Sequence, residues 1–268
     1  MAGFRGFTSF TLCGAFLIGC VAPTAHGDAL ELRVLSYNIH HGQGTDGIFD
    51  LERIADVIRA SGADLVALQE VDVNTGRAGG VDQATALAGL TGMEVRFGEA
   101  IPFSGGSYGD AVLSRWPILE TVRLQLPAEP GHELRVAVAV TVEPVPGSPV
   151  RFVATHLDHT KDPQDRIAQV QALLQEMHGN AVPTLLVGDL NAAPGSQPIQ
   201  LLMDAGWRAS DPALQPTFPS DLPQRKIDWI LLGPGSGLQP LGVEVLHAPV
   251  ASDHCPLIAI LGMQRASG

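Results

Sequence analysis

Short apolar runs separated by polar residues recur along the chain from residue 32 onwards. Each run has the length of a β-strand and is rich in Val, Leu and Ile. Strands that are apolar on both sides are typical of sheets covered on both faces. The pattern therefore predicts buried strands at residues 32–35, 65–68, 136–140, 150–153, 184–187 and 227–231.

Two segments between these runs follow a helical pattern instead. Asp50 can cap a helix that carries Ile54, Val57 and Ile58 on one stripe and ends at Gly62. A second helix starts at residues 162–163 and ends near residue 179, and its apolar stripe contains Ile167, Val170, Leu173, Leu174 and Met177. Strands outnumber helices, so we expect an α/β fold of stacked sheets clad by helices.

Composition narrows the class of protein. The chain has 268 residues, of which 45% are hydrophobic and 16% charged, with 30 Gly and 20 Pro. These values exclude a disordered protein, a coiled coil and collagen. Because no long linker, charge block or fixed repeat interrupts residues 32–261, we expect a single catalytic domain over residues 28–268.

The first 27 residues differ from the rest. Arg5 is their only charged side chain, residues 6–21 are apolar or small, and residues 25–27 fit a cleavage site. This is typical of an export signal. Residues 17–20 alternatively resemble a lipobox, in which Cys20 would be lipidated and tether the chain to a membrane. We expect an exported protein, periplasmic or secreted, that contacts a membrane surface only if Cys20 is lipidated.

The charge balance is acidic. The chain has 16 Lys and Arg against 28 Asp and Glu, a formal net charge of −12. Nucleic-acid binding relies on basic side chains, and Arg77, Arg135, Lys161 and Arg166 are scattered without interleaved aromatics. We therefore expect no stable nucleic-acid complex. Cys255 is the only cysteine beyond the signal, which excludes an internal disulfide in the mature domain, and we expect a monomer.

Polar residues capable of chemistry follow the predicted strands. Oxygen ligands of this kind suit a hard divalent cation such as Mg²⁺, with substrate phosphate completing the shell. The candidates are Asn38, Glu70, Asp189, Asn191 and Asp253. Each residue taken by itself has a structural alternative: Asn38 could cap a turn, and Asp189 could cap a helix near Ser196.

The ordered series of such fragments resembles the endonuclease/exonuclease/phosphatase superfamily. Any one fragment is weak evidence, but the series in family order over residues 32–261 is specific. The fragments are Tyr37-Asn38, Gln69-Glu70, Tyr108-Gly109-Asp110-Ala111, Thr155-His156-Leu157-Asp158-His159, Gly188-Asp189-Leu190-Asn191, Ile227-Asp228 and Ser252-Asp253-His254. The resemblance implies a four-layer α/β/β/α sandwich of two stacked mixed sheets, and phosphoester hydrolysis assisted by Mg²⁺ or Mn²⁺.

The resemblance also implies roles for individual residues. Glu70 would be the central metal ligand, with Asn38 and Asp253 beside it. His254 would be the general base, and a neighbouring carboxylate suits this role because it stabilises the imidazolium. Asp228 would be the partner of His254. Asp189 and Asn191 would position the attacking water and the phosphoryl oxygens, and His156 would donate a hydrogen bond to a non-bridging phosphoryl oxygen.

Some residues leave alternatives open. His40, His41 and His159 could be loop residues, partners of other site residues or ligands. Asp110 departs from the family pattern, in which many relatives carry Asn. An acid there could repel phosphate, or it could bind a second cation.

The leading hypothesis is an exported metal-dependent phosphoesterase. It would hydrolyse a small or lipid-linked phosphate mono- or diester by in-line attack of a His-activated water. A secreted Mg²⁺-dependent nuclease keeps the chemistry and changes the substrate. A non-catalytic binding module on the same fold is disfavoured, because clustered buried acids are costly to keep without a function.

Overall fold

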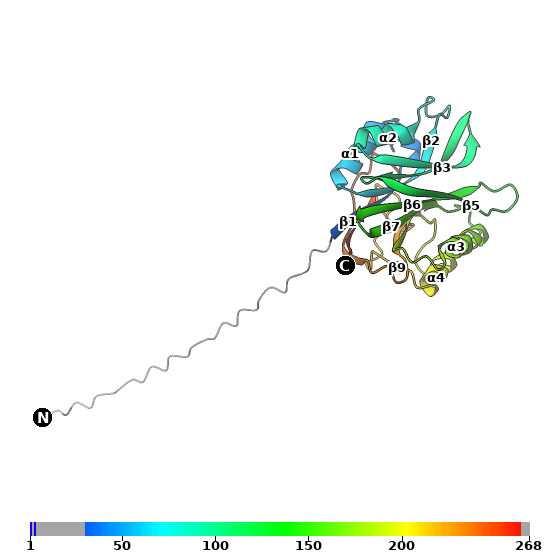
Figure 1. Cartoon of the computed structure of the whole chain (residues 1–268). Coiled ribbons are helices and arrows are strands. Elements are labelled where there is room, and N and C mark those ends of the chain that lie inside the picture. The colour runs from blue at the N-terminus through cyan, green and yellow to red at the C-terminus, as the bar shows by residue number, and fades with distance from the viewer. Residues whose placement is uncertain (2, 4–29, 264–268) are drawn as a thin grey trace.

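The structure is a computed structural model that describes residues 1, 3 and 30–263. Two six-stranded sheets are stacked face to face, and helices cover the outer face of each sheet (Figure 1). The predicted four-layer α/β/β/α sandwich is therefore confirmed. Cys20 and nearly all of the predicted export signal lie outside the described residues. Among the residues described, no helix combines the length and apolar character needed to cross a membrane.

The first sheet is mixed. Its strands β1 and β2 run parallel, whereas the other neighbours pair antiparallel. In spatial order it consists of β11 (Gln239–Val245), β12 (Leu257–Met263), β1 (Leu30–Asn38), β2 (Leu65–Val73), β4 (Gly106–Ser114) and β3 (Glu94–Phe103).

The second sheet is also mixed. Only β7 and β8 run parallel among the pairs of its described strands. In spatial order it consists of β5 (Ile118–Leu126), β6 (Arg135–Val145), β7 (Ser148–His156), β8 (Thr184–Asp189), β10 (Asp228–Leu232) and β9 (Arg208–Ala209).

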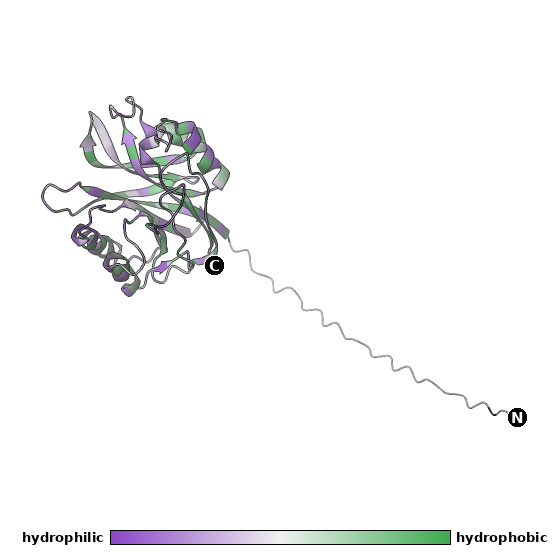
Figure 2. Cartoon of the chain, turned by 180° about the vertical axis from the view of Figure 1, so that it is seen from behind, coloured by the Kyte–Doolittle hydropathy of each residue, from purple (hydrophilic) through white to green (hydrophobic). Residues whose placement is uncertain are grey.

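The main core lies between the sheets, where apolar side chains from both inner faces pack together. Val34 and Leu65 of the first sheet share this cluster with Val138, Phe152 and Leu185 of the second. Figure 2 shows stretches of the hydrophobic colour along the central strands, interrupted by hydrophilic positions. Burial on this scale provides the main driving force for stacking the sheets.

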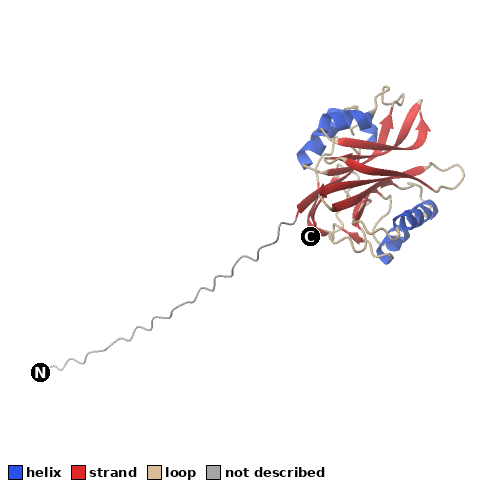
Figure 3. Ribbon diagram, in the orientation of Figure 1, coloured by secondary structure: helices blue, strands red, loops and turns tan. Residues whose placement is uncertain are grey.

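The helices close the two outer faces, as Figure 3 shows. On the first sheet lie α1 (Leu51–Ser61) and α2 (Gln83–Thr91), and on the second α3 (Gln164–Met177) and α4 (Gln197–Asp204). A short 3₁₀ turn, η1 (His40–Gly42), follows β1.

The two predicted helices are confirmed. Asp50 caps α1 by accepting a hydrogen bond from the Arg53 backbone N–H at 3.0 Å, and Gly62 ends it with a left-handed φ of 63°. The α3 helix buries Ile167 and Leu173, as its stripe predicts.

Strand ends from both sheets meet where the polar residues were predicted. The parallel strands β1 and β2 bring Asn38 next to Gln69, and β7 and β8 bring His156 next to Asp189. The antiparallel partner of β8 starts at Asp228, directly opposite Asp189. One edge of the sandwich therefore collects the candidate site.

Candidate active site

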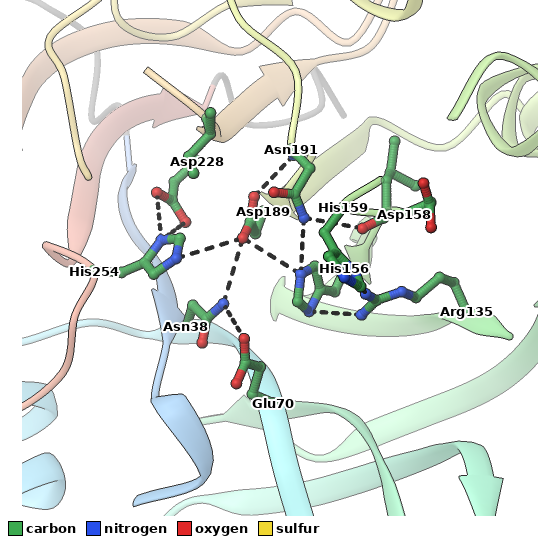
Figure 4. Close-up of polar contacts among 12 residues, drawn as sticks. Asn38, Glu70, Arg135, His156, Asp158, His159, Asp189, Asn191, Asp228 and His254 are labelled. Carbon is green, nitrogen blue, oxygen red and sulfur yellow. Dashed lines mark hydrogen bonds and ion pairs between the residues drawn. The ribbon is translucent and has the colours of Figure 1, made fainter. Parts of the chain in front are cut away.

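The side chains of both sheets converge on one carboxylate oxygen, Asp189 Oδ2 (Figure 4). It lies 3.4 Å from Asn38 Nδ2, 3.4 Å from His156 Nε2 and 3.7 Å from His254 Nε2. Glu70 joins the group through Asn38. Residues spread over more than two hundred positions of sequence thus surround one point.

Asn38 connects the two sheets. Its Nδ2 donates to Glu70 Oε1 at 3.0 Å as well as to Asp189, and its Oδ1 accepts from the His40 backbone N–H at 3.0 Å. The Ser252 hydroxyl donates to the Asn38 carbonyl at 2.7 Å. In this structure Asn38 presents its amide nitrogen to the acids and positions Glu70. Its predicted role as a metal ligand stays a prediction. The turn-capping alternative is also present, through His40.

Glu70 sits where the regular pairing of β2 with β4 is interrupted, between Leu68 and Val71. Its φ is 59°, a left-handed conformation that is strained for a non-glycine residue. Burial opposes ionisation, but the hydrogen bond from the Asn38 amide and the charge of the His254 imidazolium help to hold the pKa of Glu70 well below its usual range. The irregular backbone thus presents an ionised carboxylate, as a cation ligand requires.

Asp253 is half-buried and follows Ser252, whose hydroxyl also contacts the Asp253 carboxylate at 3.4 Å. This places Asp253 beside the backbone of Asn38. Within residues 30–263, no hydrogen bond joins Asp253 to Glu70. Its predicted role as a metal ligand stays a prediction.

Three buried residues, Asp189, Asp228 and His254, have ligand atoms within 4.8 Å of one another. His254 Nδ1 lies 3.0 Å from Asp228 Oδ2, and Nε2 faces Asp189. The Thr217 hydroxyl donates to Asp228, and the Phe218 ring packs 4.8 Å from the imidazole. Because Asp228 already contacts Nδ1 of His254, we interpret these three residues as a proton-transfer group rather than as the primary metal site.

The pKa values in this group are strongly perturbed. Burial opposes a charged imidazole, yet Asp228 and then Asp189 raise the pKa of His254 to about 10. Burial and the Asp228 charge raise the pKa of Asp189 to about 7. The two acids thus favour the protonated form of His254, and burial beside Asp228 favours the protonated form of Asp189.

His156 is fixed in a single tautomer by Arg135. Its Nδ1 lies 3.1 Å from Arg135 Nη1, and a guanidinium nitrogen only donates, so Nδ1 carries the lone pair. Burial and the Arg135 charge lower the pKa of His156 well below its ordinary value. The neutral ring therefore carries its proton on Nε2, facing Asp189.

Asn191 completes this side of the site. It has a left-handed φ of 46°, and its backbone N–H donates to Asp189 Oδ1 at 2.8 Å. Its Nδ2 donates to the Leu157 carbonyl at 3.1 Å, and its amide lies beside the His156 ring. Asn191 and His156 thus lie together on one side of Asp189. Their predicted roles, Asn191 in placing the water and the phosphoryl oxygens and His156 as a donor, stay predictions. Asp189 does not cap α4, whose N-cap is Ser196.

The sequence did not identify Arg135 as a site residue, because it was treated as one of four basic residues scattered along the chain. It is 3% exposed, and its Nη2 also lies 3.0 Å from His159 Nδ1. Arg77 and Arg166 instead pair with Asp72 and Asp158. The available signal was the position of Arg135 directly before the apolar run 136–140, where a charged residue is expected to be buried with a partner.

Asp110 is buried, with 3% exposure, on β4. Burial raises the pKa of Asp110 well above its usual range, although the Arg135 charge opposes this. A protonated carboxyl can donate a hydrogen bond, as the amide in many relatives does. Burial therefore favours the neutral form of the Asp110 carboxyl, and the two alternatives, repulsion of phosphate and binding of a second cation, stay predictions.

Comparisons with known proteins identify a family and a shared fold. The model of the endonuclease/exonuclease/phosphatase family matches residues 35–254. The uncharacterized protein YbhP of Escherichia coli is 25% identical over 242 residues, covering 85% of this chain and 95% of that protein.

Solved structures have the same fold. An endonuclease/exonuclease/phosphatase from Beutenbergia cavernae has a TM-score of 0.74 and 30% identity, covering 87% of this chain and 72% of that one. A mannosyl-6-phosphatase from Bacteroides thetaiotaomicron has a TM-score of 0.71 and 19% identity, covering 86% and 99%. At that identity the second likeness concerns the fold alone.

Proposed function

Because the chain belongs to the endonuclease/exonuclease/phosphatase family, whose members hydrolyse phosphoester bonds, we propose that it is a metal-dependent phosphoesterase. Its substrate is a small or lipid-linked phosphate mono- or diester. The observation that carries this proposal is the convergence of Asn38, His156 and His254 on Asp189 Oδ2, with Glu70 adjacent.

The donor set fits a divalent cation. Glu70 is ionised and partly exposed, with 22% of its side-chain surface accessible, and carboxylates are preferred ligands of Mg²⁺ and Mn²⁺. Glu70 would hold the ion, and Asn38 and Asp253 are the other ligands that the family resemblance implies. A bound cation would neutralise charge that develops on the phosphoryl group.

The chain's own residues supply the other parts of hydrolysis. His156 Nε2–H and the Asn191 amide donate to non-bridging phosphoryl oxygens, which stabilises developing negative charge. These donors are held in place by Arg135 and by the Leu157 carbonyl, so little reorganisation is needed when substrate binds.

The attacking water needs a proton acceptor. The sequence-based prediction gives this role to His254, but its pKa of about 10 leaves it protonated at neutral pH. We propose that Asp189 Oδ2 accepts the proton, while the His254 imidazolium, oriented by Asp228, stabilises the charge beside it. The two assignments differ in their expected pH dependence.

The substrate class rests on charge. The net charge of −12 repels polyanions, and two of the four scattered basic residues, Arg77 and Arg166, are paired with the acids Asp72 and Asp158. Only Arg135 of the four contacts a site residue in the described part of the chain, and it is buried. Such a surface favours a compact ester over a nucleic acid.

The test is turnover on a panel of phosphomonoesters, phosphodiesters, phospholipids and plasmid DNA, with Mg²⁺, with Mn²⁺ and with a chelator. We expect chelator-sensitive hydrolysis of a small or lipid ester, and loss of that activity in Glu70→Gln. Equal or faster nicking of plasmid would establish the nuclease alternative instead. No turnover of any ester, despite measurable cation binding, would favour the non-catalytic module.

We also propose that the protein is exported, from the composition of residues 1–27. Mass spectrometry of the mature amino terminus distinguishes cleavage near residue 27 from lipidation at Cys20. An intact amino terminus on the protein in its native cell would contradict both.

A further inference from the structure

We propose that His41 provides a nitrogen ligand to the divalent cation at Glu70, so that the site prefers a transition ion such as Mn²⁺ or Co²⁺ over Mg²⁺. The inference rests on the proposed cation site and adds a ligand to it. It starts from the distance between His41 Nδ1 and Glu70 Oε2, which is 3.8 Å. Only 17% of the His41 side chain and 22% of the Glu70 side chain are exposed.

The hydrogen bonds of Gln43 fix the tautomer of His41. Gln43 Nε2 donates to the Gly47 carbonyl at 2.9 Å, so Gln43 Oε1 is the atom that faces His41 Nε2 at 3.2 Å. An amide oxygen only accepts, and therefore His41 Nε2 carries the proton. In the neutral ring, Nδ1 is left with its lone pair.

That lone pair is directed towards another electron-rich group. His41 Nδ1 is buried and makes no hydrogen bond in the described part of the chain, and 3.8 Å to Glu70 is too long for one. Two atoms bound to one cation at about 2.1 Å each can lie up to about 4.2 Å apart. A shared cation accounts for both the distance and the unpartnered nitrogen.

The backbone around His41 is built to hold this position. His40, His41 and Gly42 have φ values of 46°, 43° and 80°, three successive left-handed residues. Such conformations are costly for histidine and are found mainly at functional sites. The turn is held by Gln83, whose Nε2 donates to the His41 carbonyl at 2.6 Å.

A nitrogen ligand changes which cation binds best. Mg²⁺ prefers oxygen ligands, whereas imidazole binds Mn²⁺, Co²⁺ and Zn²⁺ more strongly along the first-row series. His41 would therefore increase affinity for transition ions more than for Mg²⁺.

The experiment measures metal binding without any substrate. The full chain, freed of metal, is titrated with MnCl₂ and with MgCl₂ by calorimetry, and pulsed electron paramagnetic resonance of the Mn²⁺ complex detects a bound nitrogen. His41→Asn is the test variant, because asparagine tolerates a left-handed φ. His178→Ala is the matched control, since His178 is exposed beyond the end of α3.

We expect His41→Asn to weaken Mn²⁺ binding by about tenfold or more and Mg²⁺ binding by less than about threefold. The nitrogen coupling should be present in the wild type and in His178→Ala and absent in His41→Asn. Circular dichroism of the metal-free variant verifies that it folds; if it does not, His41→Gln replaces it.

Absence of nitrogen coupling in the wild type, or its persistence in His41→Asn, would overturn the proposal. Equal weakening of both ions would do the same. These outcomes are independent of turnover. A protein that binds Mn²⁺ through His41 but cuts no ester would contradict the proposed function and leave this ligand assignment intact.

Discussion

Glu70 and Asn191 both occupy left-handed backbone that side-chain-bearing residues rarely adopt, with φ values of 59° and 46°. Each directs its side chain towards the same cluster, Glu70 through Asn38 and Asn191 next to His156. Strain at such positions persists only when surrounding structure fixes it. Here strand pairing and hydrogen bonds provide that support, so the polar groups are oriented before substrate arrives.

The first prediction at this scale is the pH profile of turnover. Asp189 must be unprotonated to accept a proton, so kcat should rise as pH increases through about 7, its raised pKa. Loss of the His254 proton, with a pKa of about 10, should lower kcat again above that pH. The measurement is kcat against pH at saturating cation. If His254 is itself the base, kcat keeps rising towards pH 10 instead.

Arg135 gives a second prediction. Replacing it with leucine removes the donor that faces His156 Nδ1, so the Nε2–H tautomer is no longer enforced. We expect kcat to fall by about 10- to 100-fold, the range for groups that orient functional ligands. Nitrogen NMR shifts should show His156 changing tautomer.

The control for this prediction is Arg151→Leu. Arg151 lies on β7 and pairs with Glu176 of α3 at 3.0 Å, without contact to His156. It should leave both kcat and the His156 shifts unchanged. An unchanged His156 tautomer in Arg135→Leu would show that other contacts set it.

At the scale of elements, the sequence predicted helices and strands best where a single strong pattern marks them, such as an apolar run or a pair of helix caps. The buried strands β1, β2, β7 and β8 are apolar runs, and α1 has both Asp50 and Gly62 as boundary residues. By contrast, β5 is an edge strand with several exposed positions, and α2 has only nine residues. Neither pattern indicates an element until its neighbours in space are known, which is why both were missed.

Gly188 on β8 provides the prediction at this scale. Its φ is 151°, and an added Cβ would lie 1.8 Å from the Thr155 carbonyl oxygen of β7. Gly188→Ala must therefore push apart the parallel pair that places His156 beside Asp189. We expect a loss of about 3 kcal/mol or more in unfolding free energy, measured by denaturant titration.

Gly89→Ala is the matched control. Gly89 lies inside α2, and an added Cβ would meet nothing within 4 Å. Because alanine is the better helix former, this change should stabilise the fold by about 0.5–1 kcal/mol. Similar effects of the two substitutions would refute the role given to the β7–β8 contact.

At the scale of the whole molecule, the site exists only because two sheets are stacked. Glu70 belongs to the first sheet and Asp189 to the second, and Asn38 donates to both. The ordered motifs predicted this convergence through family resemblance. They could not predict that the Asn38 nitrogen faces the acids or that Arg135 orients His156, because both depend on hydrogen-bond geometry between distant strands.

A cation bound at this junction should stabilise the entire fold, because it binds the assembled sheets and not the unfolded chain. At about 100 times its Kd, such a ligand adds about 2.7 kcal/mol. For a domain of this size, that corresponds to an increase in Tm of about 5–10 °C. Thermal denaturation with Mg²⁺, Mn²⁺ or chelator measures the shift, which Glu70→Gln should largely abolish. Glu244→Gln, on the exposed face of edge strand β11, should retain it. A wild-type Tm that is insensitive to every divalent cation would show that Glu70 does not hold one.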